Sequence, residues 1–93
     1  MKLDVRFFAS LRNVTGTSQA TFDIEGDTVG DAIDALVREY GDKFKEEILE
    51  PDGNIRKYAK VLVNGNFVDR DAPLENPVKE GDTLVLFPPI LGG

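Results

Sequence analysis

The sequence predicts an α+β domain in which one main helix packs across one face of a small mixed sheet of four to five strands. Three observations favour this architecture. Apolar residues alternate near the start of the chain, a strongly amphipathic helical segment follows, and the 93-residue length fits a single domain. The two most apolar runs, 3–8 and 83–87, need neighbours on both edges, so we expect them side by side in the middle of the sheet.

The first part of the chain predicts a hairpin. Residues 2–8 alternate between charged and apolar residues, which predicts a strand with Leu3, Val5 and Phe7 on one side. Residues 18–25 alternate in the same way and predict a second strand. The segment between them is polar and contains a glycine, which is typical of the loop of a hairpin.

The main helix is expected to begin after Thr28 and to end before Gly41. Thr28 is a favourable N-cap, and Asp31 follows three residues later, as in a capping box with a shorter acid. An apolar stripe at helical spacing predicts the face that packs on the sheet, formed by Val29, Ile33, Leu36, Val37 and Tyr40. Helix capping also explains the acidic residues near this helix start better than a metal site does.

The second part of the chain predicts a short helix and three more strands. Residues 42–50 favour the helix, which should end before the proline that follows. Asn64-Gly65 is a two-residue turn signal between the β-prone segments 59–63 and 66–68. Residues 83–87 are the most hydrophobic run, which predicts a central strand buried on both faces.

Composition excludes several classes of function. The chain has 11 basic and 17 acidic residues and a net charge of −6, which disfavours nucleic acid and anionic membranes as partners. It has no Cys and no His, so disulfides, thiolate nucleophiles and the commonest general base are absent. No apolar run reaches the roughly 18–20 residues of a membrane helix, and the N-terminus does not resemble a signal peptide. We therefore expect a cytoplasmic protein with no metal and no stably bound cofactor, and with catalysis supplied by partners.

The last six residues, 88–93, predict a flexible functional tail. They are Pro88, Pro89, Ile90, Leu91, Gly92 and Gly93. The two prolines end the preceding strand and stiffen its exit, and six extended residues span about 20 Å at roughly 3.3 Å each. The two glycines carry no side chain, so a bare backbone ending in a carboxylate can enter a narrow channel. The sequence has no phosphate-binding loop, so activation of this carboxylate with ATP requires a partner enzyme.

Several short motifs occur in a fixed order along the chain. They are Phe7-Phe8-Ala9 with Leu11-Arg12, Gly16-Thr17, Thr28-Val29, Val63-Asn64-Gly65, Gly81-Asp82, and Phe87-Pro88-Pro89 followed by Gly92-Gly93. In this order the sequence resembles the MoaD/ThiS-type ubiquitin-like sulfur carriers, and within them the MoaD branch and the archaeal small modifier proteins. The resemblance covers nearly the whole chain and implies a single β-grasp (ubiquitin-like) domain over residues 1–93.

The same resemblance implies a function. Gly93 would be adenylated by an E1-like enzyme that uses ATP and then converted to a thiocarboxylate. The tail would enter the large subunit of molybdopterin synthase and donate sulfur to a pterin precursor. The chain itself would be a carrier subunit and not an enzyme.

Two other functions stay open. As a ubiquitin-like modifier, the chain would be joined through Gly93 to lysines of target proteins. As a β-grasp binding module with an incidental tail, it would function without Gly92 and Gly93, and the two glycines would be an ordinary frayed terminus.

We also expect an apolar partner-binding patch on the sheet face opposite the main helix, because one helix cannot cover both faces of such a sheet. The candidate residues are Phe8, Phe67, Val68, Leu84, Leu86 and Phe87, with Arg12 placed to pair with acidic groups of an activating enzyme. The simpler alternative is that loops cover this face and that Arg12 is solvated surface charge.

Overall fold

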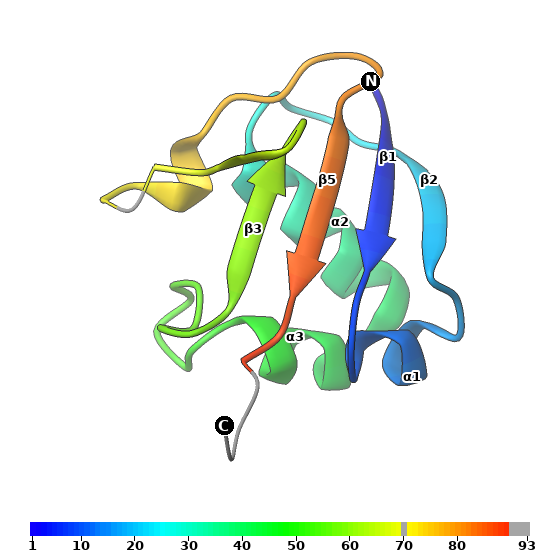
Figure 1. Ribbon diagram of the computed structural model, residues 1–93, viewed down its shortest axis with the longest axis vertical. Coiled ribbons are helices and arrows are strands. Elements are labelled where there is room, and N and C mark those ends of the chain that lie inside the picture. Colours follow the sequence, from blue (N-terminus) through cyan, green and yellow to red (C-terminus); the bar gives the residue numbers. More distant parts are fainter. Residues whose placement is uncertain (70, 90–93) are drawn as a thin grey trace.

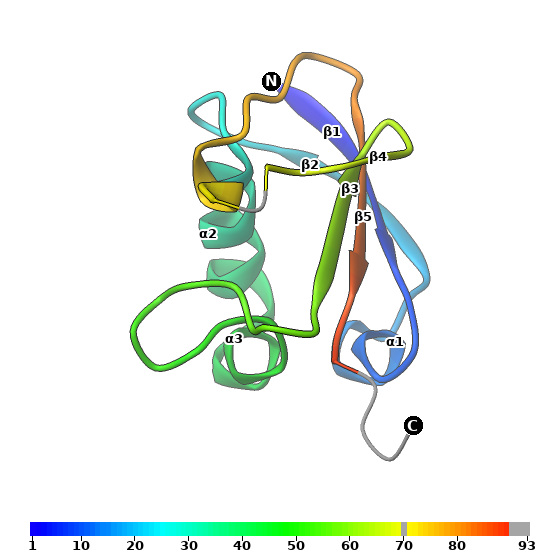
Figure 2. The same ribbon diagram turned by 60° about the vertical axis from the view of Figure 1, so that its left-hand side comes forward.

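The computed structural model describes residues 1–69 and 71–89. The elements in chain order are β1 (Lys2–Phe7), α1 (Leu11–Thr15), β2 (Gln19–Asp23), α2 (Val29–Tyr40), α3 (Asp42–Ile48), β3 (Lys60–Val63), β4 (Asn66–Phe67), the 3-10 helix η1 (Pro73–Glu75) and β5 (Thr83–Phe87). Figure 2 shows α2 and α3 on one side of the sheet, and the other side of the sheet uncovered by helices. The predicted main helix and short second helix are therefore confirmed.

The five strands form one mixed sheet in the order β2-β1-β5-β3-β4 (Figure 1). Strands β1 and β5 are parallel neighbours at the centre, with Val5 opposite Leu84, and the other pairs are antiparallel. Asn64 and Gly65 both have positive φ, 52° and 85°, as the tight turn between β3 and β4 requires. The central position of the first and last strands and the second hairpin are confirmed.

A capping box fixes the start of α2. The Thr28 hydroxyl accepts a hydrogen bond from the Asp31 N–H at 3.2 Å, and the Asp31 carboxylate accepts from the Thr28 N–H at 3.2 Å. The Asp27 N–H also donates to this carboxylate, at 3.0 Å. Hydrogen bonds from these groups favour the ionised form and lower the pKa of Asp31.

The core lies between the helices and the sheet. It consists of alternate residues of β1 and β5, the apolar stripe of α2, and parts of α3, β3 and the loops. Phe7 is fully buried, and its ring meets Tyr40 and Phe44 edge to face, at 5.7 and 6.1 Å between ring centroids. The aromatic contacts join β1 to α2 and α3, so the helical layer has one position on the sheet.

Two predictions about local structure are wrong. The loop expected between the first two strands contains the short helix α1, because buried Leu11 anchors it and Gly16, at φ 76°, ends it. Strand β5 is buried on one face only: Leu84 and Leu86 are buried, whereas Thr83, Val85 and Phe87 are partly exposed. The helices cover one side of the sheet, so only alternate residues of a central strand are enclosed.

None of the helices within 1–69 and 71–89 is both long and apolar enough to cross a membrane. The same residues contain no group of three or more acidic side chains able to hold a metal ion.

Candidate functional site

The root of the predicted tail is a fixed point at the end of the central strand. Strand β5 lies between β1 and β3 and leads directly into Pro88, which is fully buried, and Pro89, which is half-buried. A buried proline has a restricted φ, so the chain leaves the sheet at a defined place and direction. The predicted tail residues Ile90, Leu91, Gly92 and Gly93 lie outside the described residues.

An aromatic pair and an arginine surround this root. The rings of Phe8 and Phe87 are stacked with centroids 4.5 Å apart and an interplanar angle of 21°. The guanidinium carbon of Arg12 lies 5.3 Å from the Phe8 ring centroid, and Arg12 Nε donates to the Phe7 carbonyl at 3.2 Å. The parallel pairing of β1 and β5 brings Phe8 and Phe87 together, and helix α1, which the sequence failed to predict, adds Arg12 to this pair.

The uncovered face of the sheet continues from this root into an apolar hollow. Tyr58 and Phe67 are 65% and 69% exposed, and no other large apolar side chain in the described part of the chain is as open to solvent. With Lys60, Leu62, Phe87 and Pro88 they line a hollow of about 580 Å³. Tyr58 was not among the predicted site residues, although an aromatic residue between Lys57 and Lys60 was a usable signal.

Basic side chains lie over the exposed rings. Lys57 Nζ is 5.4 Å from the centroid of Tyr58, and Lys60 Nζ is 5.9 Å from that of Phe67. Together with Arg12 over Phe8, they give an acidic protein one basic and aromatic face. We call this face, formed by Phe8, Arg12, Lys57, Tyr58, Lys60, Leu62, Phe67 and Phe87, the aromatic face. Its chemistry fits a protein surface with an apolar centre and acidic margins.

Three predicted interface residues do not belong to the aromatic face. Leu84 and Leu86 are 0% exposed and form part of the core beneath α2, so their assignment to a partner interface is wrong. They pair with Val5 and Phe7 of β1, and the side chains of such neighbours point to the same side of a sheet. Val68 lines a second groove at the outer edge of β3, and its side chain lies on the other side of the strand from the exposed Phe67 ring, which also borders that groove. The partly exposed Leu62 and Val85 occupy the uncovered face instead.

The sheet order, the parallel central pair and the helix across one face define a ubiquitin-like β-grasp protein. The chain belongs to the ThiS family, whose model matches residues 5–93.

Individual relatives are similar along their whole length. The chain is 35% identical over 94 residues to small archaeal modifier protein 3 of Haloferax volcanii, covering 100% of both chains. It is 27% identical over 95 residues to the sulfur carrier protein CysO of Mycobacterium tuberculosis, again covering 100% of both. These names define the coarse function of the chain: it is a ubiquitin-like sulfur carrier or modifier.

Solved structures agree with the fold. The crystal structure of small archaeal modifier protein 1 from Haloferax volcanii matches with a TM-score of 0.82 and 36% identity over 100% of both chains. A candidate molybdopterin converting factor, subunit 1, from Pyrococcus furiosus matches with a TM-score of 0.74 and 28% identity, over 97% of this chain and 99% of that one.

Proposed function

We propose that this protein carries sulfur as a thiocarboxylate on Gly93 and delivers it in molybdopterin biosynthesis, as the small subunit of molybdopterin synthase. Partner enzymes supply the catalysis: an E1-like enzyme activates the tail with ATP, and the large synthase subunit receives it. The observation that carries the proposal is the position of buried Pro88 beside the aromatic face, which gives the tail a fixed root next to a surface suited to a partner protein.

The chemistry requires two steps at the carboxyl group of Gly93. A Gly93 carboxylate oxygen attacks the α-phosphorus of ATP, forming a mixed anhydride and releasing pyrophosphate. Sulfide, or a donor at the same oxidation level, then attacks the carbonyl carbon and releases AMP, which leaves a C–S bond in place of a C–O bond. Neither step asks for a side chain of this protein, which agrees with a sequence that has no His and no Cys.

The aromatic face has a defined part in this scheme. Docking through Tyr58, Phe67 and Phe87 would hold the root of the tail at a constant distance from the partner's active site. Aromatic side chains anchor interfaces well because they bury a large area and lose little conformational entropy. Arg12, Lys57 and Lys60 at the margin would accelerate the encounter with an acidic partner.

Intact-mass spectrometry tests the sulfur-carrier function. The protein is incubated with an E1-like enzyme, ATP and a sulfur donor, and one oxygen is expected to be exchanged for one sulfur at Gly93. A matched variant with one alanine appended after Gly93 should fold equally well, as judged by thermal unfolding, and should stay unmodified because the carboxylate has moved. An unchanged mass under conditions that activate small archaeal modifier protein 1 would contradict the proposal.

The second candidate function is conjugation to other proteins. It is favoured by the 35% identity to small archaeal modifier protein 3 over both full lengths. In this case the activated carbonyl of Gly93 forms an amide with a lysine Nζ, and AMP leaves from an acyl adenylate or a thiol leaves from a thioester. Proteomic detection of Gly93 in isopeptide bonds would support this function, whereas finding only free and thiocarboxylated protein supports the first.

A further inference from the structure

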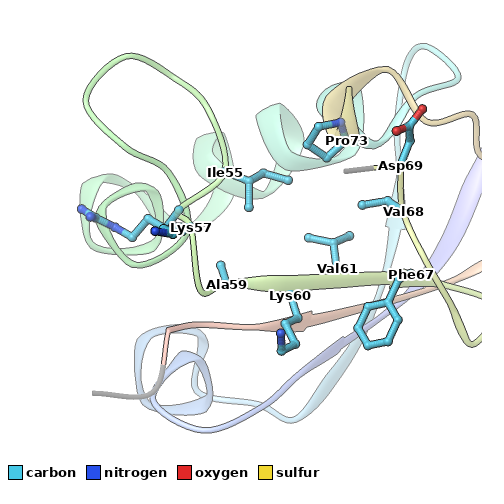
Figure 3. Close-up of a pocket in the computed structure, with 10 residues that line it drawn as sticks. Ile55, Lys57, Ala59, Lys60, Val61, Phe67, Val68, Asp69 and Pro73 are labelled. Carbon is cyan, nitrogen blue, oxygen red and sulfur yellow. The ribbon is translucent and has the colours of Figure 1, made fainter. Parts of the chain in front are cut away.

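A second groove lies at the outer edge of β3 and shares Lys57, Lys60 and Phe67 with the aromatic face (Figure 3). It has a volume of about 590 Å³ and is bounded by the segment before β3, by β3 itself, by residues 67–69 and by Pro73. Ile55, Ala59, Val61, Val68 and Pro73 form its apolar lining. Figure 3 shows the Phe67 and Lys60 side chains on the opposite side of the strand from Val61.

The wall before β3 is held in place by hydrogen bonds. The Arg56 N–H donates to the Ile48 carbonyl at 2.9 Å, and Arg56 Nε donates to the Glu46 carbonyl at 2.6 Å. The Arg56 guanidinium also pairs with Glu50 at 2.5 Å. Since these bonds tie the wall to α3, the groove is formed before any ligand arrives.

The edge of β3 exposes unused backbone groups to this groove. Val61 accepts a hydrogen bond from the Val68 N–H at 3.2 Å, so the N–H of Val61 faces the same outer edge. Among the backbone hydrogen bonds outside the sheet ladders of residues 1–69 and 71–89, none runs from the Val61 N–H or to the Ala59 carbonyl. Within the described residues, strand β4 pairs only with Leu62 and Val63 of β3.

These two groups match the pairing pattern of a parallel strand. In a parallel ladder, one residue of the incoming strand donates to the carbonyl before its opposite residue and accepts from the N–H after it. A residue opposite Lys60 would therefore donate to Ala59 and accept from Val61. An antiparallel strand would need the Val61 carbonyl, which Val68 already occupies.

The two ends of the groove carry opposite charges. Lys57, which follows Arg56 in the sequence, lies at the end where β3 begins, and Asp69 lies at the other end. Glu50 pairs with Arg56, so the positive charge at this end comes mainly from the exposed Lys57, which the groove shares with the aromatic face. A strand parallel to β3 enters at the Lys57 end, so its N-terminal residues should be acidic and the following residues aliphatic.

We propose that this groove binds an extended acidic–aliphatic peptide segment of a partner protein, added as a short parallel strand to the outer edge of β3. Main-chain hydrogen bonds to Ala59 and Val61 would provide affinity, and the apolar lining and Lys57 would provide specificity. The site is independent of the chemistry proposed for Gly93. It gives the protein a second contact surface at the outer edge of β3, which meets the aromatic face at Lys57, Lys60 and Phe67.

The test uses the full-length protein and a capped peptide, acetyl-Glu-Asp-Val-Val-Val-amide, with two-dimensional amide NMR. Shift changes are expected at residues 55–61 and 67–69, together with slower hydrogen exchange of the Val61 amide. A peptide methylated on the backbone nitrogen of the valine that would lie opposite Lys60 cannot donate to the Ala59 carbonyl. It should bind about tenfold more weakly, about 1.4 kcal/mol. The reversed sequence should also bind more weakly, because it places its acidic residues at the Asp69 end.

Two exposed lysines provide a matched pair of variants. Lys57→Glu should weaken peptide binding about threefold or more at low salt, because it reverses the charge at the entrance. Lys43→Glu reverses the same charge on α3, where Lys43 lies beside Ser10 and Asn13 and does not line the groove. This variant should bind the peptide as tightly as the unmodified protein. The proposal is overturned if millimolar peptide leaves the groove amides unchanged, if the methylated peptide binds equally well, or if the shifts fall on Leu62 and Phe87.

Discussion

Asp31 shows how a single side chain fixes the position of a helix. Its carboxylate accepts hydrogen bonds from the N–H groups of Asp27 and Thr28 and from the Thr28 hydroxyl, at 3.0, 3.2 and 3.0 Å. These contacts lower the pKa of Asp31, with the Asp27 N–H as the largest cause. The sequence predicted this arrangement because a capping box depends on local spacing and not on tertiary contacts.

The lowered pKa of Asp31 predicts a specific dependence of stability on pH. The folded pKa lies below the unfolded one, so the contribution of Asp31 is fully present above the ordinary Asp pKa of 3.8. It is lost as the pH falls through the folded value. Thermal unfolding should therefore show a smaller loss of stability in acid for Asp31→Asn than for the unmodified protein. Parallel curves for the two proteins would contradict this role.

A substitution at Gly26 tests the same cap, because Gly26 lies against the Asp31 side chain. It has a φ of 104°, and a Cβ at this position would clash with the Asp31 carboxylate. Gly53 has a similar φ of 91°, but a Cβ there would meet no atom within 4 Å, so it is a matched control for backbone strain. Gly53→Ala should cost about 1–2 kcal/mol, and Gly26→Ala about 1 kcal/mol more because the cap is displaced. Chemical denaturation measures both, and equal losses would mean that the cap adapts.

At the scale of elements, helix α2 contributes most of its stability through one face. Ile33 and Leu36 are almost fully buried against the sheet, whereas Glu39 of the same helix is exposed. Leu36→Ala should lower the free energy of unfolding by about 2–5 kcal/mol, because it leaves a cavity in the core. Glu39→Ala, measured by the same denaturant titration, should change it by less than about 0.5 kcal/mol. Similar effects for the two variants would mean that α2 does not pack as described.

Element types were predictable where a periodic pattern extended over many residues. Strand β1 and helix α2 have such patterns, and both form as expected. Helix α1 has only five residues, and its buried Leu11 depends on contacts that a local pattern does not contain. Strand β5 was misread because its run of apolar residues hides the alternation. Val85 and Phe87 are apolar, yet they face the side of the sheet that no helix covers.

The site could be predicted only in part, for a related reason. Phe8, Arg12 and Phe87 come together at the root of the tail, but Leu84 and Leu86 lie in the core. Which of two alternating sets of apolar residues faces the helices is decided by the register between strands, and a single sequence does not contain that register. Tyr58 was missed because it lies in a loop segment, where no period indicates the direction of a side chain.

At the scale of the whole molecule, the two faces of the sheet contribute to different properties of the protein. The covered face contains the core and determines stability, whereas the aromatic face carries exposed rings that stability does not require. Tyr58 and Phe67 are 65% and 69% exposed, so removing either ring takes little buried area from the folded protein. Large rings left open to solvent are typical of surfaces that become buried in a complex.

This separation predicts opposite results for two kinds of variant. Phe67→Ala should change the free energy of unfolding by less than about 0.5 kcal/mol, because the ring is exposed. It should weaken binding to the activating enzyme about tenfold or more, measured by titration calorimetry, because a central aromatic anchor is lost. Leu84→Ala should cost about 2–5 kcal/mol of stability. At a temperature where this variant stays folded, its affinity for the enzyme should be nearly unchanged. If Phe67→Ala bound the enzyme normally and Leu84→Ala did not, binding would depend on an intact core and not on the aromatic face.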